Sequence, residues 1–231
     1  MKGAMHLDGI LIVNKPAGIT SHDVVDCIRR KFNMKRVGHA GTLDPMATGV
    51  LVMLLGKATK LSSTFTGNDK EYIAKVSFGK KTDTQDSSGK VIEERNIESL
   101  DIKDIEKALE NFKGWIEQVP PMVSAIKHKG KKLYQLARSG KTVVREPRRI
   151  NISAIEILDF KFPELTFKVK CSKGTYVRTL CEDIGKVLGV PSHMSELVRT
   201  QSGDFLLEDS RDLEDIHEKD IISYSCYDRH I

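Results

Sequence analysis

The sequence predicts an α+β protein built on a mixed, largely antiparallel sheet. Residues 70–78 alternate between apolar and polar positions, as a strand with one buried face does. Residues 102–112 carry apolar side chains at helical spacing instead. Strand-like and helix-like segments do not alternate strictly along the chain, which disfavours a doubly wound parallel sheet. With 231 residues, the chain can form one large domain or two small ones.

The N-terminal elements are expected to be two strands separated by a helix and a glycine-bearing loop. Residues 9–13 are predicted to form a short strand. Thr20 or Ser21 then caps a helix, because apolar residues recur after it at helical spacing. The loop 37–45 follows, and the uninterrupted apolar run 50–55 predicts a strand buried on both faces.

The later elements follow from the same two periodicities. Helices are expected within residues 102–112, 132–138 and 177–188, and strands at 149–157 and 165–171. No internal repeat and no low-complexity linker divides the chain.

The composition is that of an ordinary globular protein, with 39% hydrophobic and 30% charged residues. No segment approaches the roughly 18 uninterrupted apolar residues that a membrane span needs. The four cysteines form no Cys-x-x-Cys pair, which indicates reduced thiols and argues against a zinc site. Charged and turn residues interrupt the short apolar run near the N-terminus, so no signal peptide is expected. We therefore expect a cytoplasmic protein.

The charges are distributed unevenly around a formal net charge of +5. Residues 127–149 contain nine lysines and arginines against one acid, whereas residues 206–231 are acidic. This asymmetry is consistent with a surface that binds a polyanion. A solvated, lysine-rich loop would have the same composition, so both interpretations remain open.

The glycine-bearing loop is the strongest candidate for a functional site. Gly38 and Gly41 allow the backbone to turn and to approach a ligand closely. Asp44 precedes Pro45, which restricts its backbone and could preorganise a catalytic carboxylate. A plain Asp-Pro turn explains the same residues. His39 is either a substrate contact or a neutral histidine bonded to the backbone.

Four residues elsewhere are further candidates. Arg178 falls in the first turn of its predicted helix, where a cation opposes the helix dipole and calls for a carboxylate. That partner is either Glu182, four residues later, or a distant group such as Asp44. Tyr72 and Tyr176 could each stack on an unpaired base or be core tyrosines. For Leu197, a core position is the simple alternative to a place in a binding pocket.

An ordered set of motifs resembles the bacterial tRNA pseudouridine-55 synthases, the TruB family. Residues 38–51, GHAGTLDPMATGVL, are similar to the catalytic motif of that family. Further similarities occur, in the family's order, at residues 14–21, 70–72 with 79–86, 118–127, 133–138, 172–180 and 197–200. The resemblance covers residues 9 to 205, and an ordered set of this length is highly specific.

The resemblance implies the pseudouridine synthase fold, an active site in a basic cleft, and a reaction that needs no metal or organic cofactor. Asp44 would be the essential catalytic aspartate and Arg178 its ion-pair partner. Tyr72 would stack on the target base and assist proton removal. His39, Tyr176 and Leu197 would contact the flipped nucleotide. Phosphate contacts are expected from basic residues near the cleft: Lys15, Lys127, Lys132, Arg138 and Arg149.

The implied partner is the T-arm stem-loop of tRNA, bound by a monomer. We expect a catalytic domain over residues 1–205 and a short acidic extension over 206–231, too short for the RNA-binding PUA domain of many family members. Two alternatives remain: the related guide-dependent synthase of ribosomal RNA, and an RNA chaperone that binds without catalysis.

Overall fold

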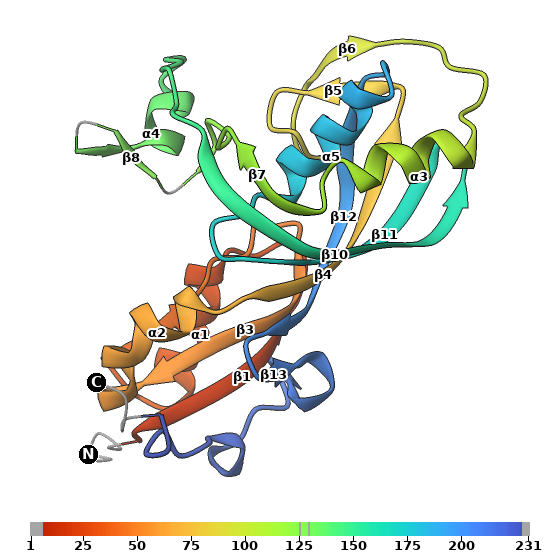
Figure 1. Ribbon diagram of the computed structural model, residues 1–231. Coiled ribbons are helices and arrows are strands. Elements are labelled where there is room, and N and C mark those ends of the chain that lie inside the picture. Colours follow the sequence, from red (N-terminus) through yellow and green to blue (C-terminus); the bar gives the residue numbers. More distant parts are fainter. Residues whose placement is uncertain (1–6, 125, 129, 228–231) are drawn as a thin grey trace. The chain divides into compact units, whose positions relative to one another are not determined.

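A computed structural model describes residues 7–124, 126–128 and 130–227 (Figure 1). The chain divides into two compact units. Unit 1 combines residues 1–72 with 197–231, and unit 2 contains residues 73–196. Ten strands of the described residues belong to one hydrogen-bonded sheet, in which β1–β14 and β3–β12 are parallel pairs. The prediction of a mixed, largely antiparallel sheet flanked by helices is confirmed.

Unit 1 is built around strand β3 (Thr48–Leu55), whose residues are almost all buried. On one side β3 pairs antiparallel with β1 (Gly9–Lys15). On the other side its beginning pairs with β12 (Ser192–Ser202) and its end with β2 (Val37–Ala40). Helix α1 (Ser21–Lys31) packs against β2. The buried strand predicted from the apolar run is therefore the central strand of this unit.

The other elements of unit 1 are short. A 3-10 turn (Gly56–Leu61) leads into α2 (Ser62–Gly67). After β12, β13 (Phe205–Leu206) pairs with it, and β14 (Arg211–Asp212) pairs with β1. Two further 3-10 turns span Leu207–Asp209 and Glu218–Asp220.

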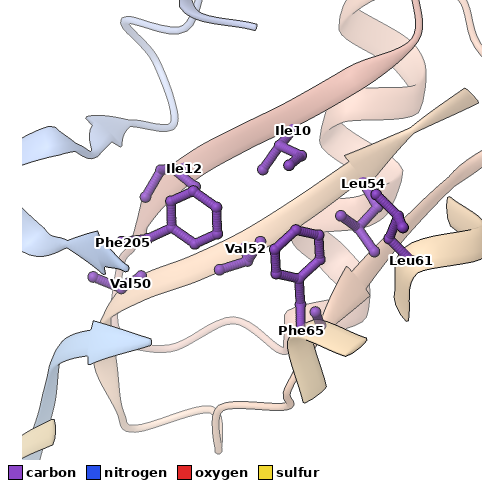
Figure 2. Packing of buried hydrophobic residues seen from close by; sticks show 9 residues of the cluster. Ile10, Ile12, Val50, Val52, Leu54, Leu61, Phe65 and Phe205 are labelled. Carbon is purple, nitrogen blue, oxygen red and sulfur yellow. The ribbon is translucent and has the colours of Figure 1, made fainter. Parts of the chain in front are cut away.

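Strands β1, β2 and β3 share an apolar core with α2 and β13 (Figure 2). Its nine buried residues are Ile10, Ile12, Ala40, Val50, Val52, Leu54, Leu61, Phe65 and Phe205. Phe65 and Phe205 lie with ring centroids 5.6 Å apart. Full burial of a side chain of this size contributes about 1.5–3 kcal/mol, so this core fixes the strands that flank the glycine-bearing loop.

Unit 2 contains a second part of the sheet, in which the strand order is β4-β11-β10-β7. These strands are β4 (Lys70–Phe78), β7 (Gly114–Gln118), β10 (Arg148–Lys161) and β11 (Glu164–Cys171). Helix α3 (Ile102–Glu110) packs against both β10 and α5 (Val177–Val187).

Three smaller pieces of unit 2 lie outside this sheet. They are the hairpin β5 (Lys80–Thr82) with β6 (Val91–Glu94), the hairpin β8 (Lys127–His128) with β9 (Lys131–Lys132), and α4 (Leu133–Arg138).

Most predicted elements are present, and the clearest omission is β12. Its inward-facing residues include Ser192, Arg199 and Ser202. A strand that buries polar and charged side chains does not show the apolar alternation by which strands are recognised in a sequence. No helix of the described residues is long and apolar enough to cross a membrane.

Candidate active site

Asp44 lies in unit 1, on the loop between β2 and β3, and is half-buried. Ser21, the first residue of α1, fixes Leu43, the residue that precedes Asp44. Its hydroxyl accepts a hydrogen bond from Leu43 N at 2.9 Å and donates to Leu43 O at 3.0 Å. On the other side, the carbonyl of Pro45 accepts from Gly18 N at 2.8 Å. The backbone around Asp44 is therefore held on both sides, which a plain exposed turn would not require.

The surroundings of Lys15 contradict its predicted contact with an RNA phosphate. Its side chain is fully buried, and its ammonium donates to the carbonyls of Pro16 at 2.8 Å, Pro45 at 3.2 Å and Ala47 at 2.8 Å. All three acceptors of the buried ammonium are main-chain carbonyls, two of them in the residues that follow Asp44, so the predicted contact between Lys15 and an RNA phosphate is wrong. The burial of Lys15 cannot be deduced from the residues around it in the sequence.

Burial lowers the pKa of Lys15 from 10.5 to about 8, although the negative charge of Asp44 opposes this shift. The positive charge of Arg199 lowers the pKa further, and the charge of Asp23 raises it. Lys15 and Asp44 thus interact electrostatically. At neutral pH Lys15 supplies a positive charge beside the predicted catalytic carboxylate.

Arg199 on β12 also contacts the backbone of this loop, although the sequence predicted no role for it. Its side chain is 1% exposed. The guanidinium donates from Nε to Val50 O at 2.6 Å and from Nη2 to Gly41 O at 3.0 Å. These two carbonyls lie on opposite ends of the segment that contains Asp44.

His39, in the middle of β2, is half-buried. Its Nδ1 atom is buried and has no hydrogen-bond partner among the described residues. Burial lowers the pKa of His39, and the positive charges of Arg199 and His22 lower it further. A neutral imidazole with an unused nitrogen is consistent with a substrate contact, whereas the alternative of a backbone bond at this nitrogen is not observed.

Tyr72 and Leu197 belong to unit 1 and lie near its boundary with unit 2 in sequence. Tyr72 on β4 is 9% exposed and Leu197 on β12 is 7% exposed. Both side chains are thus mostly covered by protein, as the core alternative requires. A small exposed part remains on each, and their predicted contacts with the base stay predictions.

Arg178 lies in unit 2, in the first turn of α5, and is 5% exposed. Its guanidinium lies 3.5 Å from a carboxylate oxygen of Asp86, measured from Nη1 to Oδ2, and donates to Val123 O at 2.7 Å. The carboxylate of Glu182, the alternative partner, pairs with Lys81 at 3.4 Å and with Lys186 at 2.7 Å.

Asp86 contacts a predicted site residue, and no role was predicted for it from the sequence. Its Oδ1 atom accepts from the hydroxyl of Thr84 at 2.7 Å, the backbone of Ser88 at 3.0 Å and the hydroxyl of Ser88. These donors fix the carboxylate and orient Oδ2 toward Arg178. The signal in the sequence is Asp86 followed by Ser-Ser-Gly, a pattern typical of a turn in which an aspartate binds nearby backbone groups.

Tyr176 is the N-cap residue of α5 and is half-buried. The amide of Gln118, at the end of β7, fixes its backbone: Gln118 donates to Tyr176 O at 3.1 Å and accepts from Tyr176 N at 2.8 Å. This bidentate contact sets the start of α5 and therefore the position of Arg178.

Of the remaining predicted phosphate contacts, only Arg149 has a described side chain. It is exposed and lies over the ring of Trp115 at 4.7 Å from the centroid. The side chains of Lys127, Lys132 and Arg138 lie outside the described residues, so these predictions are unchanged.

Comparison with known proteins first identifies the class of protein to which the chain belongs. The chain is similar to a solved chain of a Cbf5-Nop10-Gar1 complex, with a TM-score of 0.73 and 33% identity over 91% of this chain. The chain spans about half (54%) of the length of that solved chain. Residues 29–177 match the TruB family pseudouridylate synthase N-terminal domain, and residues 178–229 the tRNA pseudouridylate synthase B C-terminal domain. The fold is therefore that of a pseudouridine synthase.

Curated relatives narrow the class to a family. The chain is 50% identical to tRNA pseudouridine synthase B of Symbiobacterium thermophilum over 93% of this chain and 73% of that protein. It is also 50% identical to the protein of that name from Clostridium tetani, over 93% of this chain and 74% of the relative. The chain belongs to the TruB family of pseudouridylate synthases. The predicted enzyme class is thus confirmed, while the division at residue 205 stays a prediction.

Proposed function

We propose that this protein converts uridine-55 in the T loop of tRNA into pseudouridine, with Asp44 as the essential catalytic residue. One observation carries the proposal. In a member of the TruB family, Asp44 lies on a loop whose backbone is fixed by Ser21 and Lys15. Such preorganisation is expected of a group that must meet a reacting atom at a defined position.

The proposed reaction exchanges one bond for another without an added reactant. The bond between C1′ of the ribose and N1 of uracil breaks, the base rotates, and C1′ bonds to C5. The proton on C5 is lost and N1 gains one, so atoms and electrons balance. Asp44 either adds to the sugar or removes its 2′ proton. Both roles require an ionised carboxylate, because only that form is a nucleophile or a base.

Arg178 is proposed to pair with Asp44. An opposite charge within a few ångströms favours the ionised form of a carboxylate. The planar guanidinium can also orient both carboxylate oxygens through paired hydrogen bonds. Within unit 2, Asp86 and the carbonyl of Val123 already fix two of its nitrogens. Arg178 would thus bring a positive charge in a fixed position to Asp44.

The target base must leave its stack before it can react. Flipping a base costs a few kcal/mol, which contacts in the binding pocket offset. We propose that Tyr72 stacks on the uracil and assists removal of the C5 proton. His39 would contact the flipped nucleotide, and Tyr176 and Leu197 would line the uracil pocket.

Basic residues are proposed to hold the phosphates of the T arm. These residues are Lys127, Lys132, Arg138 and Arg149. Neutralising phosphates releases counterions, so RNA binding should weaken steeply as salt increases.

A guide-dependent synthase of ribosomal RNA is the second candidate, and the similarity to a Cbf5-Nop10-Gar1 complex is the observation that favours it. The identity is 33% to that chain and 50% to curated tRNA enzymes, which favours the tRNA substrate.

Incubation of the purified protein with an unmodified tRNA transcript tests the proposal. Pseudouridine mapped by position should appear at residue 55 alone, without any partner protein. A transcript with cytidine at that position is the control and should remain unmodified. Product at other positions, or activity only with a guide RNA, would contradict the proposed substrate. Binding without any product would instead favour the RNA chaperone.

A further inference from the structure

Arg199 is a buried cation close to the Asp44 loop. Its guanidinium has no carboxylate within 4.0 Å among the residues that the structure describes, so backbone carbonyls take its donors. A buried charge without an ionic partner is costly to the folded state. Strand β12 could place an apolar side chain here at lower cost. The charge at this position therefore calls for a functional explanation.

The hydrogen bonds of Arg199 connect the two ends of one segment. Gly41 follows β2 directly, and Val50 lies in β3. Because one planar guanidinium binds both carbonyls, it fixes their separation and orientation together. The eight residues between them, 42–49, include Asp44.

Two glycines with positive φ lie next to Arg199. Gly49 lies opposite Arg199 in the parallel pairing of β3 with β12 and has a positive φ of 98°. A side chain at Gly49 would collide with the main-chain carbonyl of Arg199. Gly41 also has a positive φ, 93°, and a Cβ there would lie 3.5 Å from Nη1 of Arg199. The main chains of β3 and β12 thus approach each other closely at Gly49 and Arg199, and the guanidinium lies at ordinary contact distance from Gly41.

The charge of Arg199 also acts on the groups around the loop. It lowers the pKa of Lys15 and of His39. Lys15 in turn interacts with Asp44. The loop therefore lies in a positive field produced by two buried cations, and a positive field favours the ionised form of a carboxylate.

We propose that Arg199 is a positioning residue for Asp44: its bridge between Gly41 and Val50 fixes the loop, and its buried charge favours the ionised carboxylate. This inference rests on the proposed function of Asp44. Arg199 need not contact the RNA. Its loss should slow the chemical step and leave substrate binding unchanged.

Two substitutions distinguish loss of the bridge alone from loss of both the bridge and the charge. Arg199→Lys keeps the charge, but a single ammonium on a shorter reach cannot bind both carbonyls in the same geometry. Arg199→Gln keeps a hydrogen-bonding group and removes the charge. Displacement of a catalytic group by about 1 Å costs roughly 10²-fold in rate. We expect a loss of that order for Arg199→Gln and a smaller loss for Arg199→Lys.

The measurements are the single-turnover rate of pseudouridine formation and the dissociation constant for a catalytically inert T-arm hairpin. For both variants the dissociation constant should stay within about twofold of that of the wild type, since binding contacts are intact. The acid limb of the rate profile should move to higher pH in Arg199→Gln and stay in place in Arg199→Lys. His39 and Lys15 also titrate near the loop, and the Lys variant preserves the charge acting on both.

A stability-matched control excludes a general folding defect. Leu54→Ala removes a fully buried side chain near the end of β3, away from Arg199. All variants are assayed at the same interval below their melting temperatures. If both Arg199 variants retain activity equal to that of Leu54→Ala, the inference is wrong. Weakened RNA binding at an unchanged rate would also overturn it.

Asp44→Asn separates this inference from the proposed function. An active Asp44→Asn enzyme would refute the catalytic role of Asp44 itself. An inactive Asp44→Asn enzyme with fully active Arg199 variants would refute only the role of Arg199.

Discussion

Asp44 and Arg178 belong to different units, and each unit fixes its charged side chain in a different way. In unit 1, buried cations bind main-chain carbonyls: Lys15 those of Pro45 and Ala47, and Arg199 those of Gly41 and Val50. These bonds fix the backbone that carries the carboxylate.

In unit 2 the charged side chain is held directly. Arg178 contacts the carboxylate of Asp86 and the carbonyl of Val123. Asp86 is itself fixed by hydroxyl and backbone donors from Thr84 and Ser88. The comparison indicates that substitutions in unit 2 should act through the side-chain network of Arg178, and those in unit 1 through the shape and field of the loop.

The largest effect among the supporting residues is expected for Arg178→Lys. Lysine keeps the charge but loses the planar fork that reaches Asp86 and Val123 together. Because the charge proposed to pair with Asp44 would be misplaced, the single-turnover rate should fall by about 10²-fold or more. Filter binding with a T-arm hairpin should show unchanged affinity. A rate within threefold of the wild type would show that the geometry of this arginine is unimportant.

A smaller loss is expected for Asp86→Asn. The amide preserves the shape of the side chain but removes a negative charge that lies 3.5 Å from the guanidinium of Arg178, so this buried cation is less well stabilised. We expect the rate to fall by about one order of magnitude and the melting temperature to decrease.

Glu182→Gln is the matched control for Asp86→Asn. This carboxylate is also buried in unit 2, and it pairs with Lys81 and Lys186. Glu182→Gln should lower the melting temperature without slowing catalysis. Equal loss of rate in both variants would remove Asp86 from the network.

A pH effect distinguishes unit 1. Lys15 has a pKa of about 8, so its ammonium loses a proton, and its charge, as the pH rises through that value. The neutral amine has two donors for three carbonyls, and the loop loses a positive charge. The rate should therefore decline above a pH of about 8. Lys15→Met should be slower at pH 7 and lack this limb.

Stability should change in the opposite direction over the same range. Between pH 8 and 10.5 the unfolded chain binds the proton of Lys15 and the folded chain does not. The contribution of this group to stability therefore rises with pH in that window. A fall in rate that follows a fall in the melting temperature would contradict the assignment to Lys15.

The smallest effect is expected at the surface of unit 2. Arg149 is exposed and stacks on Trp115. If it meets one phosphate, Arg149→Ala should weaken RNA binding modestly and reduce the slope of log affinity against log salt by about one. The single-turnover rate at saturating RNA should not change. An unaltered salt slope would exclude this contact.

Sequence patterns predicted those parts of the fold in which burial follows hydrophobicity. Thr20 caps α1 through a capping box with Asp23, and β4 has the predicted bounds. The same reasoning failed at β12, where Arg199 faces inward. It also assigned Lys15 to a phosphate, because a lysine is assumed to be exposed unless its partners are known.

In the candidate site, too, some residues could be predicted from the sequence and others could not. Motif resemblance predicted roles for Asp44 and Arg178, and these roles stay predictions. The supporting contacts of Asp86, Gln118 and Arg199 join residues that are distant in sequence, so spacing alone could not predict them.

The central claim is tested most directly by single-turnover assay of Asp44→Asn on unmodified tRNA, with RNA binding measured in parallel. The substitution keeps the size of the side chain and removes the ionisable group, while Asp26→Asn on the exposed face of α1 serves as control. We predict wild-type affinity and no pseudouridine at position 55 for Asp44→Asn, and full activity for Asp26→Asn. Turnover by Asp44→Asn near the wild-type rate would contradict the account.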